Sequence, residues 1–359
     1  MPKAQTLIDS ERELAQWTAL SYPPLCEPVS DEEPGALRCH ACGHHCLIRP
    51  GKQGICKVRF NVSGTLRVPF GYVATTQLDP IEKKPFFHVT PGAKALSFGM
   101  LGCDFHCGYC QNWDISQALR DPAVSARPKP TDPQTLVKIA KEQGASMLTS
   151  TYNEPLITAE WSRHVFQTAR AAGLKTSFVS NGNATPEALE HILPWLDCYK
   201  IDLKTFQDKG YRELGGQLKH VLWSIKEIHA HGTWLEIVSL LIPGFNDSDN
   251  ELRQMAEFLA SVSPDIPWHV TAFHEDYKMH GMGNTPAQTL LRAAHLGRQA
   301  GLRYVYAGNL PGSVDDFENT RCPDCQTVLV ERVGYHVKKP LLKNGACPAC
   351  SKKIPGIWT

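Results

Sequence analysis

Cysteine is the residue that most constrains this chain, because eleven of its 13 cysteines fall into three tight groups. The groups are Cys39, Cys42, Cys46 and Cys56, then Cys103, Cys107 and Cys110, and finally Cys322, Cys325, Cys347 and Cys350. A cysteine-rich disulfide scaffold is normally short, whereas this chain has 359 residues. Residues 1–10 lack the basic and apolar regions of a signal peptide, and no apolar run approaches the roughly 20 residues that span a bilayer. We therefore expect a cytoplasmic protein, without membrane association, whose reduced thiols bind metal.

The charge balance gives no case for electrostatic capture of nucleic acid. The chain carries 37 Lys and Arg against 36 Asp and Glu, a net charge of +1. Hydrophobic residues make up 42% and charged residues 20%, which is enough for a packed core. The cysteine groups predict three parts: an N-terminal metal-binding module over 1–88, a middle domain over 89–315, and a C-terminal module over 316–359.

The middle domain alternates strand-like with helix-like runs. The predicted strands cover 95–100, 146–151, 175–180, 198–203, 234–242, 268–273 and 304–307, and the predicted helices cover 135–143, 156–172, 186–193, 221–231, 251–262 and 289–300. This alternation predicts an α/β fold with a parallel sheet that curls into a partial (β/α)6-type barrel, and in such folds the carboxyl ends of the strands carry the chemistry. A further helical pattern covers 7–20.

The three-cysteine loop, residues 102–110 (GCDFHCGYC), follows the first predicted strand of the middle domain. Iron–sulfur clusters are usually held by four cysteines, so a cubane held by Cys103, Cys107 and Cys110 would leave one iron open for a reactive ligand. A zinc site that includes His106 is the alternative. The C-x3-C-x2-C spacing, Tyr109 and the preceding strand favour the cluster.

At this point the sequence resembles the radical S-adenosylmethionine (SAM) superfamily, whose signature is this loop. A closer resemblance, to the radical SAM proteins of the AmmeMemoRadiSam system, rests on five runs in order: 79–88 (DPIEKKPFFH), 102–117 (GCDFHCGYCQNWDISQ), 151–155 (TYNEP), 199–204 (YKIDLK) and 304–312 (YVYAGNLPG). Those proteins are similar to pyruvate formate-lyase activating enzymes. The resemblance implies a [4Fe-4S] cluster whose open iron binds SAM, cleavage of SAM to a 5′-deoxyadenosyl radical, and hydrogen abstraction from a substrate.

The resemblance also implies a set of SAM-contacting residues: Tyr109, Asn153, Glu154, Asn181, Asp202, Lys204 and His274. Each has a plainer interpretation. Glu154 can serve as a helix N-terminal carboxylate, Asn181 can belong to an Asn-Gly turn, and Asp202 with Lys204 can form a structural ion pair. His274 can be an ordinary surface histidine. Lys83 and Lys84 either bind the SAM carboxylate or an anionic substrate, or are solvated.

The two flanking cysteine groups favour zinc to different degrees. The C-terminal spacing, C-x2-C-x21-C-x2-C, is typical of a zinc ribbon, with a rubredoxin-like iron site as the alternative. The N-terminal spacing, C-x2-C-x3-C-x9-C, with His40, His44 and His45 interleaved, favours zinc over a second iron–sulfur cluster. Cys26 and Cys198 carry no spacing signal, and Cys198 is interpreted as a small buried hydrophobic residue.

Four functional hypotheses follow. The first is a radical SAM enzyme that works with MEMO and AMMECR-domain proteins and takes electrons from a flavodoxin- or ferredoxin-type donor. The second is an activating enzyme for a glycyl radical enzyme. The third is a zinc-bearing RNA-binding or RNA-modifying protein, which the flat net charge and the lack of an aromatic-basic stripe disfavour. The fourth is a non-catalytic metal scaffold.

Overall fold

The computed structural model describes residues 13–29, 34–124, 126–338 and 340–359, and one large sheet organises them. The sheet has eight strands in the order β16-β15-β14-β13-β12-β11-β9-β8. Its strands are β8 (Thr75–Pro80), β9 (Lys94–Gly99), β11 (Met147–Ser150), β12 (Lys175–Ser180), β13 (Cys198–Asp202), β14 (Trp234–Leu241), β15 (Trp268–Ala272) and β16 (Val305–Gly308). All neighbouring pairs are parallel except β8 with β9. The predicted parallel α/β sheet is confirmed, and within the described residues its two edges, β8 and β16, are not paired with each other.

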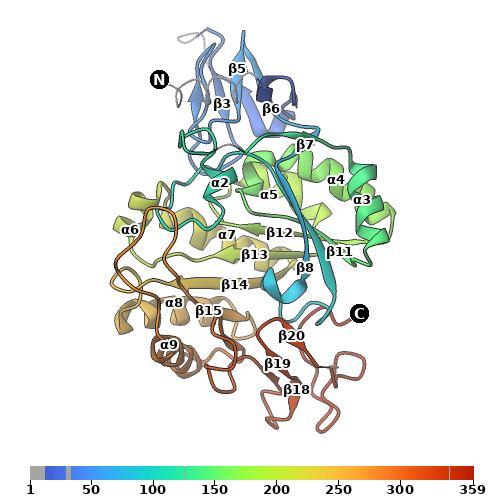
Figure 1. Cartoon of the computed structure of the whole chain (residues 1–359), viewed down its shortest axis with the longest axis vertical. Helices are drawn as coiled ribbons and strands as arrows, with labels where there is room; N and C mark the ends of the chain where they lie inside the picture. Colours follow the sequence, from blue (N-terminus) through green and yellow to red (C-terminus); the bar gives the residue numbers. More distant parts are fainter. Residues whose placement is uncertain (1–12, 30–33, 125, 339) are drawn as a thin grey trace.

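Helices connect the parallel strands, as the alternation predicts (Figure 1). They are α3 (Pro133–Glu142), α4 (Ala159–Ala171), α5 (Pro186–Ile192), α6 (Asp208–Leu214), α7 (Leu218–His231), α8 (Asp249–Val262) and α9 (Ala287–Gln299). Local capping fixes where several begin: the side chains of Asp132, Thr185 and Ser248 accept hydrogen bonds from backbone N–H groups in the first turns of α3, α5 and α8. The short helix α2 (Trp113–Ser116) follows the three-cysteine loop.

Strand β8 and helix α6 were not predicted from the sequence. Strand β8 reads TTQLDP, with exposed Thr76, Gln77 and Pro80, so it shows no apolar run. As an antiparallel edge strand it needs only one hydrogen-bonded neighbour, and it tolerates a proline at its end. The helix predicted over 7–20 is confirmed only in part: residues 13–15 are helical, but Thr18–Leu20 forms strand β1, which pairs with β6 (Thr65–Pro69). Residues 1–12 of that prediction lie outside the described residues.

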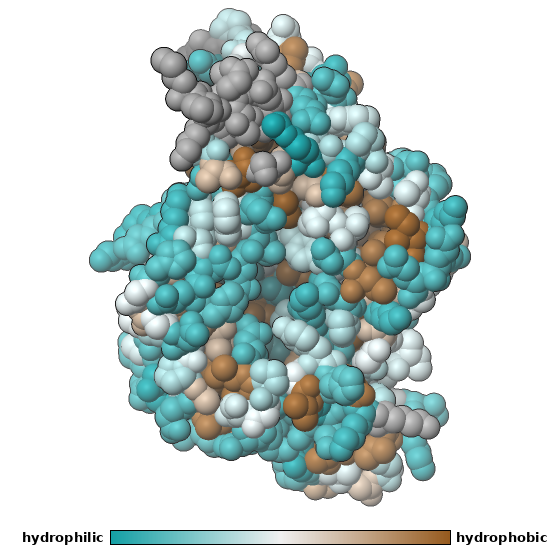
Figure 2. Space-filling view, in the orientation of Figure 1, coloured by the Kyte–Doolittle hydropathy of each residue, from teal (hydrophilic) through white to brown (hydrophobic). Residues whose placement is uncertain are grey.

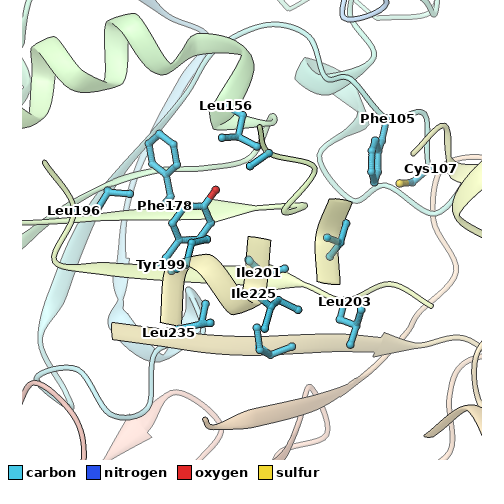
Figure 3. Packing of buried hydrophobic residues seen from close by; sticks show 14 of the residues in the cluster. Phe105, Cys107, Leu156, Phe178, Leu196, Tyr199, Ile201, Leu203, Ile225 and Leu235 are labelled. Carbon is cyan, nitrogen blue, oxygen red and sulfur yellow. The ribbon is translucent and has the colours of Figure 1, made fainter. Parts of the chain in front are cut away.

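The core lies between the sheet and the helices and reaches the three-cysteine loop. Figure 3 shows Phe178 of β12 beside Tyr199 of β13, with Phe105 and Cys107 at the far end of the same cluster. All four residues are buried. The loop therefore packs against the apolar interior of the fold.

The two ends of the chain form small sheets at opposite ends of the molecule (Figure 1). The N-terminal part contains a sheet of β2 (Cys26–Pro28), β3 (Leu37–Cys39) and β4 (Leu47–Ile48), and a second of β1, β6 and β5 (Phe60–Val62). The C-terminal part contains the pairs β17 (Thr320–Arg321) with β18 (Val328–Val330), and β19 (Arg332–Val333) with β20 (His336–Val337).

Figure 2 shows a mostly hydrophilic face on which hydrophobic side chains form small separate groups. Among the described residues, no helix has the length and apolar character needed to cross a bilayer.

Candidate radical SAM site

The three-cysteine loop leaves the carboxyl end of β9 at a point of close backbone approach. A Cβ atom on Gly99 would lie 2.8 Å from the carbonyl oxygen of Thr151, so glycine lets the chain segments after β9 and β11 come together. The backbone N–H of Phe105 donates to Cys103 Sγ at 3.4 Å, and the Ser116 hydroxyl lies 3.2 Å from Cys110 Sγ. Such donors stabilise thiolates, which are the form of cysteine that binds iron.

The donor set fits an iron–sulfur cluster better than a single ion. Burial raises the pKa of Cys107 to about 11, and burial together with the Asp104 carboxylate raises that of Cys103. These thiolates therefore need a nearby positive charge, which iron supplies. Among the described residues, the sulfurs of Cys103, Cys107 and Cys110 do not form a compact group in which all lie within 4.8 Å of one another. A cluster does not require such a group, because each thiolate binds a different iron.

Asp104, between two of the cysteines, is fully buried and connects the loop to two other parts of the chain. Its carboxylate accepts from Asn181 Nδ2 at 2.8 Å and Asn183 Nδ2 at 2.9 Å, and it lies 3.6 Å from His44 Nδ1. Burial acts to raise the pKa of Asp104, but His44 and the two amides hold it below its usual range. Sequence reasoning missed Asp104 and Asn183. The signal that points to Asp104 is an acidic residue between two cysteines of the loop.

Asn181, a predicted SAM contact, is buried and belongs to the hydrogen-bond network around Asp104. Besides its bond to Asp104, its side-chain oxygen accepts from the Asn183 backbone N–H at 2.9 Å. It lies directly after β12, on the same edge of the sheet as the three-cysteine loop. The structure therefore brings Asn181 to the loop and gives it a positioning role there.

Tyr152, two residues before Glu154, has an unusual backbone conformation. Its φ angle is +72°, in the left-handed region that glycine favours. Its hydroxyl lies 3.1 Å from both Asp79 Oδ2 and Lys84 Nζ. Strained non-glycine backbone of this kind is concentrated at functional sites.

Glu154 is buried, and the protein itself supplies three donors to its carboxylate. They are Ser180 Oγ at 2.7 Å, the Asn181 N–H at 2.7 Å and the Leu156 N–H at 3.0 Å, so the helix N-terminal interpretation is confirmed. Burial first, and the Asp104 charge second, raise its pKa to about 8. A cation placed beside it, such as the SAM ammonium, would favour its ionised form. Neighbouring Asn153 accepts from the Met100 N–H at 2.9 Å and so ties the segment after β11 to the end of β9.

Asp202 and Lys204 lie at the end of β13 and form the expected ion pair, at 3.3 Å. Lys200, which the sequence did not single out, binds the other oxygen of Asp202. Burial opposes the charge of Lys204, but Asp202 and then Tyr109 raise its pKa well above the usual value. The Lys204 ammonium is 5.9 Å from the centre of the Tyr109 ring. This pair therefore lies beside the three-cysteine loop.

The remaining candidates divide between the site and the surface. His274 is exposed, but its Nε2 is 2.8 Å from Gln111 Nε2, directly after Cys110. Lys83 and Lys84 both bind Asp79, at 2.8 and 2.6 Å; the side chain of Lys83 is half-exposed and that of Lys84 is buried. The solvated interpretation is wrong for Lys84, whose side chain is buried against Asp79, while binding of the SAM carboxylate or of an anionic substrate stays a prediction.

The C-terminal cysteines form a compact four-ligand group. All four sulfurs lie within 4.8 Å of one another, with Cys322 to Cys350 at 3.5 Å and Cys325 to Cys347 at 3.6 Å. A zinc ion bound by four thiolates at about 2.3 Å holds its sulfurs about 3.8 Å apart. The arrangement therefore fits a closed, single-metal site.

The N-terminal cysteines are arranged differently. Among the residues that the structure describes, Cys39, Cys42, Cys46 and Cys56 do not form such a group; Cys42 instead clusters with His44 and Asp104. Because Asp104 belongs to the three-cysteine loop, the N-terminal group lies against that loop.

Comparison with known proteins finds a matching family model, relatives in sequence and similar solved structures. The family model described as the radical SAM superfamily matches residues 99–259, which include the three-cysteine loop. An uncharacterized protein of Methanocaldococcus jannaschii is 35% identical over 322 residues, which cover 89% of this chain and 95% of that protein. The pyruvate formate-lyase-activating enzyme of Staphylococcus epidermidis is 24% identical over 195 residues, covering 52% of this chain and 76% of the enzyme. Among solved structures, Streptococcus suis SuiB bound to precursor peptide SuiA aligns over 64% of this chain and 51% of its own, with 16% identity and a TM-score of 0.47.

Proposed function

The chain belongs to the radical SAM superfamily and is an enzyme of SAM radical chemistry, and from this premise we propose that it is the radical enzyme of an AmmeMemoRadiSam-type system. In this proposal it abstracts a hydrogen atom from a substrate that it handles together with MEMO and AMMECR-domain partners. The observation that carries the proposal is the three-cysteine loop at the carboxyl edge of the parallel sheet, held by Asp104, Asn181 and Asn183. The five motif runs, present in order along the chain, support the finer assignment.

Cys103, Cys107 and Cys110 would hold a [4Fe-4S] cluster, which would supply the electron for cleavage of bound SAM to methionine and a 5′-deoxyadenosyl radical. The residues of the chain bind and orient. Glu154 would accept the SAM ammonium, and Lys204, oriented by Asp202, would attract its carboxylate. Tyr109, which is buried beside Lys204, keeps water from this part of the site.

The test is anaerobic reconstitution with iron and sulfide, followed by dithionite and SAM, with 5′-deoxyadenosine as the measured product. Cys103→Ala, Cys107→Ala and Cys110→Ala should each lower its formation at least ~1000-fold, because the cluster loses a ligand. Cys198→Ala is the matched control, since Cys198 is buried in β13 and outside all three cysteine groups. Undiminished product from the loop variants would refute the proposal.

A second candidate, activation of a glycyl radical enzyme, is favoured by the similarity to the Staphylococcus epidermidis activating enzyme. In that reaction the hydrogen comes from a backbone glycine of a partner protein. A partner labelled with deuterium at glycine should then transfer the label to 5′-deoxyadenosine and show a glycyl radical by EPR. Label transfer from any other substrate would select the first candidate.

A further inference from the structure

The N-terminal cysteine group consists of Cys39 at the end of β3, Cys42 and Cys46 in the turn that follows, and Cys56 on the next loop. Cys39, Cys42 and Cys56 are buried and Cys46 is partly exposed. The Ile55 N–H points to Cys46 Sγ at 3.5 Å. A Cβ on Gly54, two residues before Cys56, would lie 3.6 Å from Cys46 Sγ, so the two loops that carry the four cysteines lie side by side.

The spacing of these sulfurs differs from that of the C-terminal group in the same molecule. The C-terminal sulfurs all lie within 4.8 Å, as one ion requires, whereas the N-terminal four do not. A cluster of several irons binds each thiolate at a different metal and so needs more widely spaced sulfurs. The N-terminal group therefore lacks the compact single-ion geometry of the C-terminal group, and an iron–sulfur cluster does not require that geometry.

This group also contacts the three-cysteine loop directly. A Cβ on Gly102, the residue before Cys103, would lie 2.8 Å from the Cys56 carbonyl oxygen, so the two loops touch through backbone. Arg120 donates to the carbonyl oxygens of both Phe105 and Ile55 and so ties the loops together.

His44, from the turn between Cys42 and Cys46, adds a third connection between the two loops. Its Nε2 donates to the Gly215 carbonyl at 2.6 Å, while Nδ1 lies 3.5 Å from Cys42 Sγ and 3.6 Å from Asp104 Oδ2. One imidazole therefore contacts a member of the N-terminal group and the residue next to Cys103. Electron transfer falls steeply with distance, and this continuous contact keeps the path between the two groups short.

We propose that Cys39, Cys42, Cys46 and Cys56 hold a second iron–sulfur cluster, which takes one electron from a ferredoxin- or flavodoxin-class donor and passes it to the three-cysteine site. The donor is oxidised by one electron, and the second cluster is reduced and then reoxidised. The electron ends on the SAM sulfonium, whose C5′–S bond breaks to give the methionine thioether and the 5′-carbon radical. This inference rests on the proposed function, because the three-cysteine site must be the place where SAM is reduced.

The exposed residues near Cys46 indicate where an electron-donor protein would bind. Cys46 is the partly exposed member of the group, and Ile55, whose backbone N–H contacts it, has a side chain that is 38% exposed. Lys52, on the same loop, is also exposed. An apolar side chain near a cation suits a transient partner with an acidic surface.

The first experiment measures metal rather than activity. In Cys103→Ala/Cys107→Ala/Cys110→Ala, reconstituted anaerobically, about four irons and four sulfides per chain should remain, and reduction should give an EPR signal from one cluster. Absence of inorganic sulfide from the triple variant would overturn the proposal, because the C-terminal single-metal site contains none and only an iron–sulfur cluster in the N-terminal group would supply it. Cys46→Ala should lose this signal. Cys26→Ala is the control that should keep it, because Cys26 lies opposite Cys39 in the β2–β3 register but is outside the group.

The second experiment compares electron donors. With a reduced flavodoxin system, Cys46→Ala should form 5′-deoxyadenosine at least ~10-fold more slowly than the unmodified protein, whereas with dithionite, a small reductant that reaches the loop directly, the rates should differ by less than ~3-fold. Equal rates with both donors would refute the relay and leave the proposed function intact. No product from the unmodified protein with dithionite would instead refute the proposed function.

A third measurement covers the case in which Cys46→Ala does not fold. The unmodified protein, mixed with reduced flavodoxin without SAM and freeze-quenched, should show the N-terminal signal before that of the three-cysteine site. The spectrum of the triple variant identifies the N-terminal signal. The reverse order would overturn the proposal.

Discussion

The N-terminal and C-terminal cysteine groups share their ligand chemistry but contact opposite edges of the sheet. The N-terminal group meets the carboxyl edge, where Cys56 touches Gly102 and His44 approaches Asp104. The C-terminal part meets the amino edge, where the N–H groups of Phe87 and His88 donate to Glu236 of β14, and His88 bonds to the Pro355 carbonyl. The first arrangement brings the N-terminal cysteines against the three-cysteine loop, while the second covers the end of the sheet away from that loop.

Each part is also anchored by one buried arginine, and the two anchors differ in kind. Arg59 makes two bonds to Glu160 of α4, at 2.7 and 2.8 Å, with both side chains buried. Arg332 instead donates to the Phe87 carbonyl at 2.7 Å and Thr320 Oγ1 at 2.6 Å, and lies 4.2 Å from the centre of the Phe87 ring. The N-terminal anchor is thus an ion pair, and the C-terminal anchor relies mainly on neutral acceptors.

The largest effect is expected from Arg59→Met. Burial acts to raise the pKa of Glu160, but Arg59 holds it below its usual value, so the carboxylate is ionised. Removing the arginine leaves a buried carboxylate without its cation, which should lower the free energy of unfolding by ~3–5 kcal/mol. Urea denaturation at pH 7 measures it. Arg59→Lys keeps the charge and should recover part of the loss; a loss below ~1 kcal/mol for Arg59→Met would show that this anchor is not the ion pair described.

A smaller effect, confined to the C-terminal anchor region, is expected from acid. Burial lowers the pKa of His88 to about 4, well below its ordinary value, and Nε2 lies 2.6 Å from the Tyr306 hydroxyl. Below about pH 6.5 the unfolded chain binds a proton that the folded chain excludes, so stability is full above that pH and is lost as the pH falls toward 4.

Lowering the pH from 7 to 5 should therefore reduce the free energy of unfolding by about 2 kcal/mol, because the unfolded chain binds a proton at His88. Urea unfolding at the two pH values measures it. His88→Gln keeps a donor and an acceptor but does not titrate, so its pH dependence should be smaller by that amount. An unchanged pH dependence in His88→Gln would show that His88 is not the group responsible.

Much of this arrangement could be predicted from the sequence, because it depends on local pattern. The seven parallel strands follow from apolar runs separated by amphipathic helices, and each has its counterpart in the sheet. The compact C-terminal group follows from two C-x2-C turns. The three-cysteine loop was placed correctly because it directly follows a strand that the apolar pattern identifies.

The contacts between distant segments could not be predicted in this way. Arg59 and Glu160 are 101 residues apart, and nothing near either residue indicates the other. The same holds for Asp104 with Asn183, 79 residues away. Periodicity shows which face of an element is buried, but the partner of a buried charge depends on how elements pack, which a single sequence does not reveal.

The smallest effect, and the sharpest test of the contrast between the anchors, is expected from Arg332→Met. Arg332 lies 3.7 Å from Glu82, but burial raises the pKa of Glu82, so this carboxyl group can take up a proton when the arginine is removed. The Gly92 N–H, which donates to Glu82 at 3.0 Å, remains in place. The cost is then mainly the hydrogen bonds to Phe87 and Thr320 and should be about 1–2 kcal/mol in urea denaturation. A loss as large as that of Arg59→Met would mean that both anchors are ion pairs, and the distinction drawn from the neutral acceptors of Arg332 would be wrong.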